Sequence, residues 1–333
     1  MNTLPVILII GCGSIGERHL RTFLKTGRCR AIACDTRPAI LADMAAKYQV
    51  PTVTDWRAAL ADPAVTAVVV ATPAPYHVAI ATAVLRTGRH CLIEKPLSLN
   101  LDGLDALQAA HAASGRACQV AYVHHSRLEV RAARAFLHSG KFGRVLSATL
   151  VSGQDFPFFR PAYREIYYAH HEQGGGAIQD GLTHMVNLIE WILGPTTSLM
   201  CDAAHQLLEG VEVEDTVSIV SRNQAGAIVT YSLNQFQAPN EGTLQFNAEH
   251  GSVKVEYHLN RWGHFARGAE NWTWETCPPI DRDTLFITQA GDFLDACEGK
   301  ETPMATLAEG IQAVKFNLAA FTSLRTGTRQ TVT

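Results

Sequence analysis

Three glycines near the start of the chain have the spacing of a phosphate-binding turn. Gly11, Gly13 and Gly16 follow the apolar run Val6–Ile10 directly and precede a helical pattern. The first glycine permits a tight turn, the second lets the backbone approach a pyrophosphate, and the third lets the helix pack against the strand. The helix N-terminus adds N–H groups and a positive dipole. We therefore predict that this turn binds a dinucleotide through its own residues: Gly11, Gly13, Ser14, Ile15 and Gly16.

An acidic residue at the end of the second strand-like run bears on which dinucleotide fits. Asp35 lies 19 residues after Gly16, where a carboxylate accepts hydrogen bonds from both ribose hydroxyls and repels a 2′-phosphate. This position favours NAD. Arg37 could instead pair with a 2′-phosphate, so NADP is the less favoured alternative. A turn or helix-capping role before Pro38 is the structural alternative for Asp35.

A threonine–proline pair follows the fourth strand-like run, residues 67–71. In an open parallel sheet, the ligand lies in the crevice outside the carboxyl ends of the strands. Thr72 and Pro73 should therefore border the cofactor. His77 lies at the start of the next helix, where ligand contact and a purely structural role are equally plausible.

Glu94, Lys95 and Pro96 follow the next strand-like run, residues 91–93. Glu94 and Lys95 should reach the same crevice, with the lysine beside the reactive end of the cofactor. Lys95 is thus the best candidate for a catalytic cation. Taken alone, a lysine at a strand end is more often a solvated charge.

The second informative stretch carries an acid and an imidazole four residues apart. Three glycines, 174–176, precede a helical pattern that contains Asp180 and His184. At this spacing both side chains lie on one helical face. An aspartate that orients an imidazole or a substrate beside a reacting hydroxyl is acid–base equipment. A structural Asp–His hydrogen bond is the competing interpretation.

The elements that must position these groups change character along the chain. Up to about residue 122, short β-branched runs alternate with helical patterns, which predicts βαβ units and a parallel sheet. Beyond it, one helix, an aromatic and arginine-rich loop and a second helix lead into alternating segments. We expect five consecutive antiparallel strands there: 145–151, 214–221, 227–234, 243–248 and 252–257. The tail, 306–324, has an amphipathic helical pattern and should pack back on the first domain.

Composition excludes several classes of protein. In 333 residues, 28 Lys and Arg balance 31 Asp and Glu, so no excess charge attracts nucleic acid or an anionic membrane. No apolar run is long enough to span a bilayer. The N-terminus lacks the features of a secretory signal, so we expect a cytoplasmic protein. The eight cysteines form no Cys-x-x-Cys pair and should be buried, reduced thiols rather than zinc ligands.

These motifs, in this order, resemble the glucose–fructose oxidoreductase, inositol dehydrogenase and MocA (Gfo/Idh/MocA) family over the whole chain. The matching pieces are the glycine turn, 71–73 with His77, 94–96, 174–180 with His184, and the tail 303–324. The resemblance implies a Rossmann NAD(P)-binding domain over residues 1–122 and an α+β domain over residues 123–303 with a large, mostly antiparallel open sheet. The tail helix, 304–324, would return to the first domain.

The resemblance also implies an activity, the reversible NAD(P)-dependent oxidation of a ring hydroxyl on a sugar, cyclitol or sugar-acid derivative. Lys95 and His184 would share proton transfer while Asp180 binds and orients the substrate between them. The Lys95-Pro96 bond of this family is often cis, and the exposed sheet face commonly forms homodimers or homotetramers.

Two departures from the family pattern concern the substrate. Many members carry an arginine where this chain reads 122–127, so Tyr122 and His125 become candidates for substrate contact. The loop 159–168 resembles a branch associated with sugar acids or nucleotide sugars. Its arginines could hold a carboxylate or phosphate and its tyrosines could stack on a ring; a solvated or interface loop is the equal alternative. The loop candidates are Arg160, Tyr163, Arg164 and Tyr167.

Three other functions remain open at this stage. A hydrolytic metal site could form from residues 170–172 beside Asp180 and His184, although their spacing sets no shared face. A lyase or glycosidase that oxidises its substrate transiently would retain NAD and release no NADH. A sugar sensor could keep the dinucleotide fold without catalysis. An intact Lys95, Asp180 and His184 argue against the sensor.

Overall fold

The computed structural model describes residues 4–333. Residues 1–3, which are part of the N-terminal stretch used to predict that no secretory signal is present, lie outside the described residues. The chain forms two compact units. The first comprises the residues up to Val123 together with Asp281–Ile311, and the second comprises His124–Ile280 together with Gln312–Thr333. No helix in the described part of the chain is long and apolar enough to cross a membrane.

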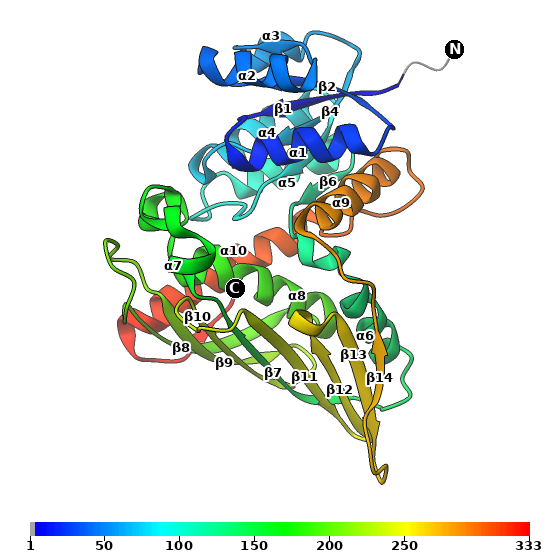
Figure 1. Cartoon of the computed structure of the whole chain (residues 1–333), viewed down its shortest axis with the longest axis vertical. Helices are drawn as coiled ribbons and strands as arrows, with labels where there is room; N and C mark the ends of the chain where they lie inside the picture. Colours follow the sequence, from blue (N-terminus) through cyan, green and yellow to red (C-terminus); the bar gives the residue numbers. More distant parts are fainter. Residues whose placement is uncertain (1–3) are drawn as a thin grey trace. The chain divides into compact units, whose positions relative to one another are not determined.

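The first unit is built on a six-stranded parallel sheet (Figure 1). The strand order is β3-β2-β1-β4-β5-β6, so the chain direction across the sheet reverses between β1 and β4. All five residues of β1 are buried, as expected of a central parallel strand covered on both faces. The predicted α/β fold is confirmed. The strands are β1 (Val6–Ile10), β2 (Arg30–Cys34), β3 (Thr52–Val53), β4 (Val65–Val70), β5 (His90–Ile93) and β6 (Cys118–Val120).

Helices that follow the strands complete the first unit. Five of them fit the helical patterns that alternate with the strand-like runs, and they are α1 (Ser14–Lys25), α2 (Pro38–Tyr48), α3 (Trp56–Ala59), α4 (His77–Arg86) and α5 (Leu104–Ser114). A sixth, α9 (Arg282–Cys297), comes from far along the sequence and packs on α1, where the rings of Phe23 and Phe293 meet edge to face at 6.1 Å. The prediction that residues 281–303 lie in the second domain is wrong, because they belong to the first unit.

The second unit holds a nine-stranded sheet in the order β14-β13-β12-β11-β7-β10-β9-β8-β15. Its pairs are antiparallel except β7 with β10, which run parallel. The expected run of consecutive antiparallel neighbours is therefore wrong at β7, which lies between β10 and β11. The strands are β7 (Val145–Gly153), β8 (Thr196–Ala204), β9 (Thr216–Asn223), β10 (Ile228–Asn234), β11 (Glu241–Ala248), β12 (Gly251–Glu256), β13 (Arg261–Ala266), β14 (Thr273–Thr276) and β15 (Gln330–Thr331).

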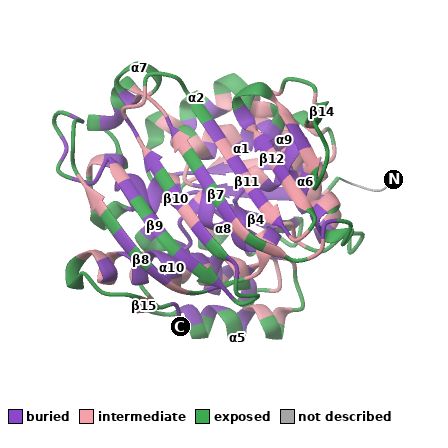
Figure 2. Ribbon diagram, turned by 90° about the horizontal axis from the view of Figure 1, so that it is seen from below, coloured by how far each residue is buried: buried purple, intermediate pink, exposed green. Residues whose placement is uncertain are grey.

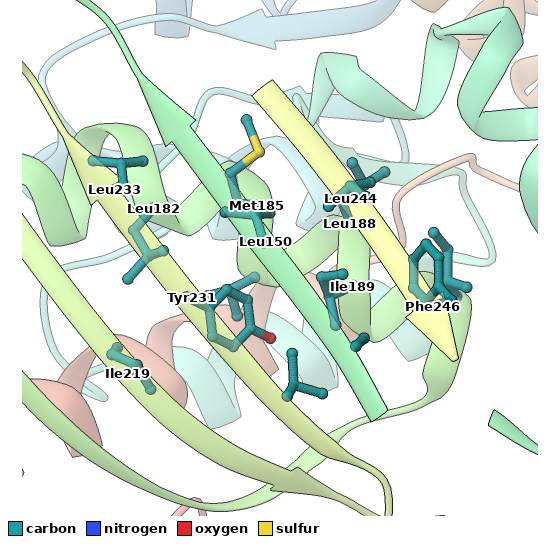
Figure 3. Packing of buried hydrophobic residues seen from close by; sticks show 14 of the residues in the cluster. Leu150, Leu182, Met185, Leu188, Ile189, Ile219, Tyr231, Leu233, Leu244 and Phe246 are labelled. Atoms are coloured by element: carbon teal, nitrogen blue, oxygen red, sulfur yellow. The ribbon is translucent and has the colours of Figure 1, made fainter. Parts of the chain in front are cut away.

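One face of this sheet is packed against helices. Figure 3 shows Leu150, Tyr231 and Phe246 of the sheet interleaved with Leu188 and Ile189 of α8, and all of these side chains belong to one buried cluster. The helices of the second unit are α6 (Leu128–His138), α7 (Phe156–Phe159), α8 (Thr183–Leu193) and most of α10 (Leu307–Thr326).

The tail helix differs from its prediction. Only the first turn of α10 belongs to the first unit, whereas its remaining length, from Gln312, belongs to the second. Phe316, Ala319 and Ala320 are buried in the same cluster as the sheet, and the Phe316 ring meets Tyr231 at 5.8 Å. The amphipathic pattern identified a helix with a buried face, but not the surface that covers it.

The other face of the nine-stranded sheet is open. Along β7, β9 and β10 buried and exposed residues alternate, and Figure 2 shows the exposed ones as green bands across the strands. Such alternation is typical of an antiparallel sheet covered on one side only. Several of the outward side chains are apolar: Leu146, Val151, Met200, Val220 and Ile228.

Candidate functional site

The glycine turn between β1 and α1 has the geometry of a phosphate-binding loop. Gly11 has a φ of +87°, and a Cβ there would come within 2.7 Å of the Ala71 carbonyl oxygen. A Cβ on Gly16 would lie 1.7 Å from the Gly11 carbonyl oxygen. By contrast, a Cβ on Gly13 would meet nothing within 4 Å. Gly11 and Gly16 are thus required by packing, while Gly13 leaves space beside the α1 N-terminus.

A hollow of about 400 Å³ adjoins this turn within the first unit. It is lined by Cys12, Gly13, Ser14, Glu17, Ala39, Ile40, Asp43 and Met44. The residues present therefore fit a dinucleotide, because the turn supplies bare backbone, a helix N-terminus and adjoining space together.

Asp35 lies at the end of β2 with both oxygens engaged. Cys12 N donates to Oδ2 at 2.9 Å, and the Arg37 guanidinium donates to Oδ1 and Oδ2, each at 2.9 Å. Burial raises the pKa of Asp35, but the hydrogen bonds from Arg37 and Cys12 outweigh it and hold the pKa below its ordinary value. The Arg37 side chain is 61% exposed. The carboxylate is therefore fixed beside the glycine turn and is paired with a largely exposed cation.

His77 connects the loops that follow β4 and β5. Its Nε2 lies 2.7 Å from the Thr72 carbonyl oxygen, and its Nδ1 lies 3.0 Å from the Pro96 carbonyl oxygen. The ring is buried, and burial lowers its pKa. Both contacts are to backbone, so His77 braces the two loops, while Thr72 and Pro73 lie at the carboxyl end of β4.

The segment after β5 contains a buried acid beside the candidate lysine. Glu94 is 5% exposed; its Oε1 lies 2.6 Å from His19 Nε2, and its Oε2 accepts from Lys95 N at 3.0 Å. The Lys95-Pro96 peptide is cis, as the resemblance implied. Lys95 is half-buried. Sequence reasoning did not identify His19, although a histidine three residues after the last glycine of the turn was a visible signal.

In the second unit, Asp180 lies in a short π-helix, Ala177–Leu182, that runs into α8. Asp180 is 3% exposed; Tyr167 donates its hydroxyl to Oδ1 at 2.7 Å, and Arg160 NH1 donates to Oδ2 at 3.2 Å. Three sequence candidates are thus brought together. The widened helical turn is a rare form that is frequently found at functional sites.

His184 lies in the first turn of α8 and contacts a histidine that sequence reasoning did not select. The His124 ring meets the His184 ring edge to face at 5.0 Å. Arg127 Nε donates to His124 Nδ1 at 3.2 Å, and the Arg127 guanidinium also lies over the Tyr257 ring at 4.9 Å. Because arginine is only a donor, His124 Nδ1 accepts and any ring proton is on Nε2.

A second acid, Glu214, is hydrogen-bonded to the backbone of the π-helix. Glu214 is buried; its Oε1 accepts from Ile178 N at 2.9 Å, and His171 Nε2 bonds to Oε2. This hydrogen bond raises the pKa of His171. A Cβ on Gly176, whose φ is +87°, would lie 2.6 Å from Glu214 Oε1. The glycines before Asp180 thus allow this carboxylate to approach the backbone.

The side chains of the remaining substrate candidates are buried or bonded to other groups of the protein. Tyr163 is 1% exposed and donates its hydroxyl to the Glu209 carbonyl oxygen, which also accepts from Arg164 Nε. His125 is fully buried, with its ring stacked on Trp191 at 4.2 Å. Tyr122, in the first unit, is 2% exposed. Of the predicted loop residues, Arg160 and Tyr167 are therefore the two beside Asp180.

The metal alternative has no assembled ligand set in the described chain. Among residues 4–333, no group of three or more His, Cys, Asp or Glu side chains is arranged to hold an ion. His171 is committed to Glu214, and His170 pairs with Glu172 on the surface.

Family models match both units. An oxidoreductase family model with an NAD-binding Rossmann fold matches residues 6–122, and a model of the GFO/IDH/MocA C-terminal domain matches residues 130–254. The chain belongs to the Gfo/Idh/MocA family of oxidoreductases. The family resemblance, the fold and the enzyme class predicted from the sequence are thereby confirmed.

Individual Gfo/Idh/MocA relatives extend over most of the chain. A 1,5-anhydro-D-fructose reductase from Ensifer adhaerens is 28% identical and aligns with 80% of this chain and 79% of its own. A levoglucosan dehydrogenase from Pseudarthrobacter phenanthrenivorans is 25% identical, over 75% and 73%. A solved levoglucosan dehydrogenase, in complex with NADH and levoglucosan, superposes with a TM-score of 0.90 at 20% identity and covers 99% of this chain and 100% of its own.

Proposed function

We propose that this Gfo/Idh/MocA-family chain is an NAD-dependent dehydrogenase that reversibly oxidises a ring hydroxyl of a sugar or cyclitol. The observation that best supports this is Asp180, a buried carboxylate that faces two donors, Arg160 and Tyr167, and lies four residues before His184. Hydroxyl groups both donate and accept hydrogen bonds, so they suit a site that offers acceptors and donors together.

The cofactor side of the reaction uses the first unit. NAD, when bound, supplies the hydride acceptor. The glycine turn and the N-terminus of α1 bind its pyrophosphate, Asp35 accepts from the adenosine ribose, and the Thr72–Pro73 loop borders the bound molecule. Glu94 and His77 hold the loop that carries Lys95.

Proton transfer uses Lys95 and His184. Lys95 removes the proton from the reacting hydroxyl when the alcohol is oxidised, and His184 is the second acid–base group. Asp180 binds and orients the substrate. In the reverse direction the same groups return the proton to the alkoxide.

The charges around Asp180 favour an uncharged substrate over a sugar acid. The Arg160 guanidinium already faces the Asp180 carboxylate, and Arg164 already contacts Glu209. A substrate carboxylate at Arg160 would share this guanidinium with Asp180 and would place a second negative charge beside a buried acid, which is unfavourable. The curated relatives named above act on the uncharged sugars that their names state.

The test is the change of absorbance at 340 nm with NAD and then NADP across matched neutral and acidic compounds. The panel pairs levoglucosan, 1,5-anhydro-sugars, aldoses and inositols with uronic acids and sialic acids. We expect NADH release with a neutral compound. Turnover of acids alone would contradict the substrate class, and product without free NADH would replace the dehydrogenase with a lyase that retains NAD.

Variants test the two acid–base groups. Lys95→Ala and His184→Ala should each lower kcat by about 100-fold or more, the usual contribution of a positioned acid or base. NAD affinity, measured by calorimetry, should be nearly unchanged. Lys300→Ala is the matched control because this lysine is on the surface, 62% exposed. Wild-type turnover in either acid–base variant would exclude its assigned role.

The open sheet face supports a homodimer or homotetramer. A shallow hollow of about 650 Å³ lies on this face across β7, β8, β9 and β10. Around it are the exposed apolar side chains of Val151, Met200 and Val220, separated by short hydroxyl side chains such as Thr149 and Thr230. A flat face of this kind can pair with the same face of a second copy.

A further inference from the structure

A buried acid–imidazole pair lies in the first unit and has no part in the proton transfer described above. His19, in α1, is 1% exposed, and its Nε2 lies 2.6 Å from Oε1 of Glu94, which is 5% exposed. The imidazole is enclosed by aromatic rings, with Phe286 of α9 edge-on at 5.3 Å and Phe23 of the next turn at 6.5 Å.

A buried acid–imidazole pair contributes little net stability to a fold. Removing an acid and an imidazole from water carries a desolvation penalty that can exceed their mutual attraction, and well-packed apolar residues often stabilise a fold equally well. A buried pair of this kind therefore calls for another explanation. The groups that contact the His19–Glu94 pair indicate its role.

The His19–Glu94 pair contacts the backbone of the segment that carries Lys95. The second oxygen of Glu94, Oε2, accepts from the backbone N–H of Lys95 at 3.0 Å. On the far side of the lysine, the Pro96 carbonyl oxygen lies 3.0 Å from His77 Nδ1. The Lys95 backbone is therefore held from both sides, by α1 through His19 and Glu94, and by α4 through His77.

We propose that His19 is a positioning residue, which fixes Glu94 and through it the Lys95 backbone, and so couples the helix that follows the glycine turn to the catalytic lysine. This inference rests on the proposed role of Lys95. The order of contacts is His19 Nε2–H to Glu94 Oε1, then Lys95 N–H to Glu94 Oε2. An apolar residue at position 19 would leave Glu94 buried with one oxygen unsatisfied.

The titratable groups that face Glu94 are His19 from α1, Lys95 beside it and His77 from α4. Burial raises the pKa of Glu94, but the hydrogen bond from His19 and the charges of His19 and Lys95 outweigh it, so the pKa lies below its ordinary value. Without His19, two of the contributions that lower the pKa of Glu94 are lost, so this pKa would be higher than in the wild type. Glu94 would then take up a proton on acidification, at a pH where the wild-type carboxylate is still ionised.

The experiment compares His19→Leu with His19→Gln in the full chain. The leucine variant lacks the donor, whereas a glutamine amide can place an N–H near the position of Nε2. We expect His19→Leu to lower kcat by about 10- to 100-fold with little change in KM for NAD, because a misplacement of about 1 Å can cost 100-fold in rate. His19→Gln should recover most of the loss.

Phe23→Leu is the matched control. Phe23 lies on the same helix, is fully buried and contacts His19 and Phe293, but has no polar contact with Glu94. It should lower the melting temperature without changing kcat of the folded enzyme. Equal kcat losses in His19→Leu and Phe23→Leu, or no rescue by glutamine, would overturn the proposal in favour of a packing role.

The pH profile gives a second readout. His19→Leu should lose kcat on the acid side at a higher pH than the wild type. Glu94→Gln should lack that extra loss, because a glutamine does not titrate. In the double variant His19→Leu/Glu94→Gln, the kcat losses of the two single variants should not add, because both substitutions break the same chain of contacts. Additive losses and an unchanged acid side would contradict the coupling.

A third readout does not depend on turnover. Reductive methylation with ¹³C labels the lysine amines, and loss of a signal in Lys95→Arg assigns Lys95. We expect the pH titration of that signal to differ between wild type and His19→Leu and to be the same in wild type and Phe23→Leu. If Lys95→Ala turns over normally, the proposed catalytic role fails, whereas an unchanged Lys95 signal in His19→Leu refutes the positioning itself.

Discussion

Both oxygens of Asp35, the carboxylate proposed to bind the cofactor ribose, already accept hydrogen bonds from Arg37. Arg37 donates two hydrogen bonds to Asp35 but is largely exposed. An exposed ion pair contributes little free energy, so an exposed arginine can exchange one partner for another at little cost in stability. At the level of single residues, we propose that Asp35 favours NAD over NADP and that Arg37 is the group that changes partner when a cofactor binds.

Replacing Asp35 tests this preference. Asp35→Asn removes the charge that repels a 2′-phosphate while Arg37 remains, so NADPH affinity should rise by about 10-fold relative to NADH. Arg37→Ala should weaken NADPH binding more than NADH binding. Fluorescence titration with both reduced cofactors measures the ratio. Arg30→Ala, an exposed arginine at the other end of β2, should leave it unchanged; an equal shift in that control would remove Asp35 as the determinant.

At the scale of elements, the π-helix carrying Asp180 is held by an acid from a distant part of the chain. Glu214 accepts from the backbone N–H of Ile178 and is itself bonded by His171. The widened turn is thus fixed by a side chain rather than by its own periodicity. We expect this arrangement to make the stability of the fold depend on pH.

The pH dependence follows from the raised pKa of His171. A histidine whose pKa in the folded chain exceeds its ordinary value of 6.5 stabilises the fold fully below that value and loses this contribution as pH rises through the folded pKa. The side chain is 47% exposed, so solvent screening keeps the effect small. His171→Gln should lower the melting temperature more at about pH 5.5 than at about pH 8.5.

The control for this experiment is the neighbouring histidine. His170 pairs only with Glu172, and both side chains are more than half exposed. His170→Gln should therefore leave the pH dependence of the melting temperature as it is in the wild type. Identical melting curves for wild type and His171→Gln at acid pH would contradict the stabilising role of the His171–Glu214 pair.

At the scale of the whole molecule, the proposed assembly depends on one face of the nine-stranded sheet. Val220→Glu and Val151→Glu introduce charges among the exposed apolar side chains of that face. A charge buried without a partner in a self-complementary contact weakens it strongly. Both variants should shift the mass measured by light scattering toward the single chain, whereas Leu101→Glu, an exposed apolar position in the first unit, should not. A wild-type protein already at the mass of one chain would refute the assembly.

Local signals were enough for most of the first unit. Alternating buried runs, the glycine turn and the helix ends predicted its parallel sheet and the position of Asp35, because a βαβ unit is specified by residues close together in sequence. The motifs around Lys95 and Asp180 could be recognised for the same reason. Even in the second unit, the strand segments 227–234 and 243–248 closely match β10 and β11.

Tertiary structure decided the contacts that join distant residues. Strand β7 lies between β10 and β11, α9 returns to α1, and most of α10 packs in the second unit. The bond from His19 to Glu94 spans 75 positions, and that from Arg160 to Asp180 spans 20. Periodicity tells which face of an element is buried but not which partner covers it. The sequence by itself thus determined the chemistry that each segment carries, and only folding decided which of those groups meet, because long-range pairing depends on the combined packing of all the elements.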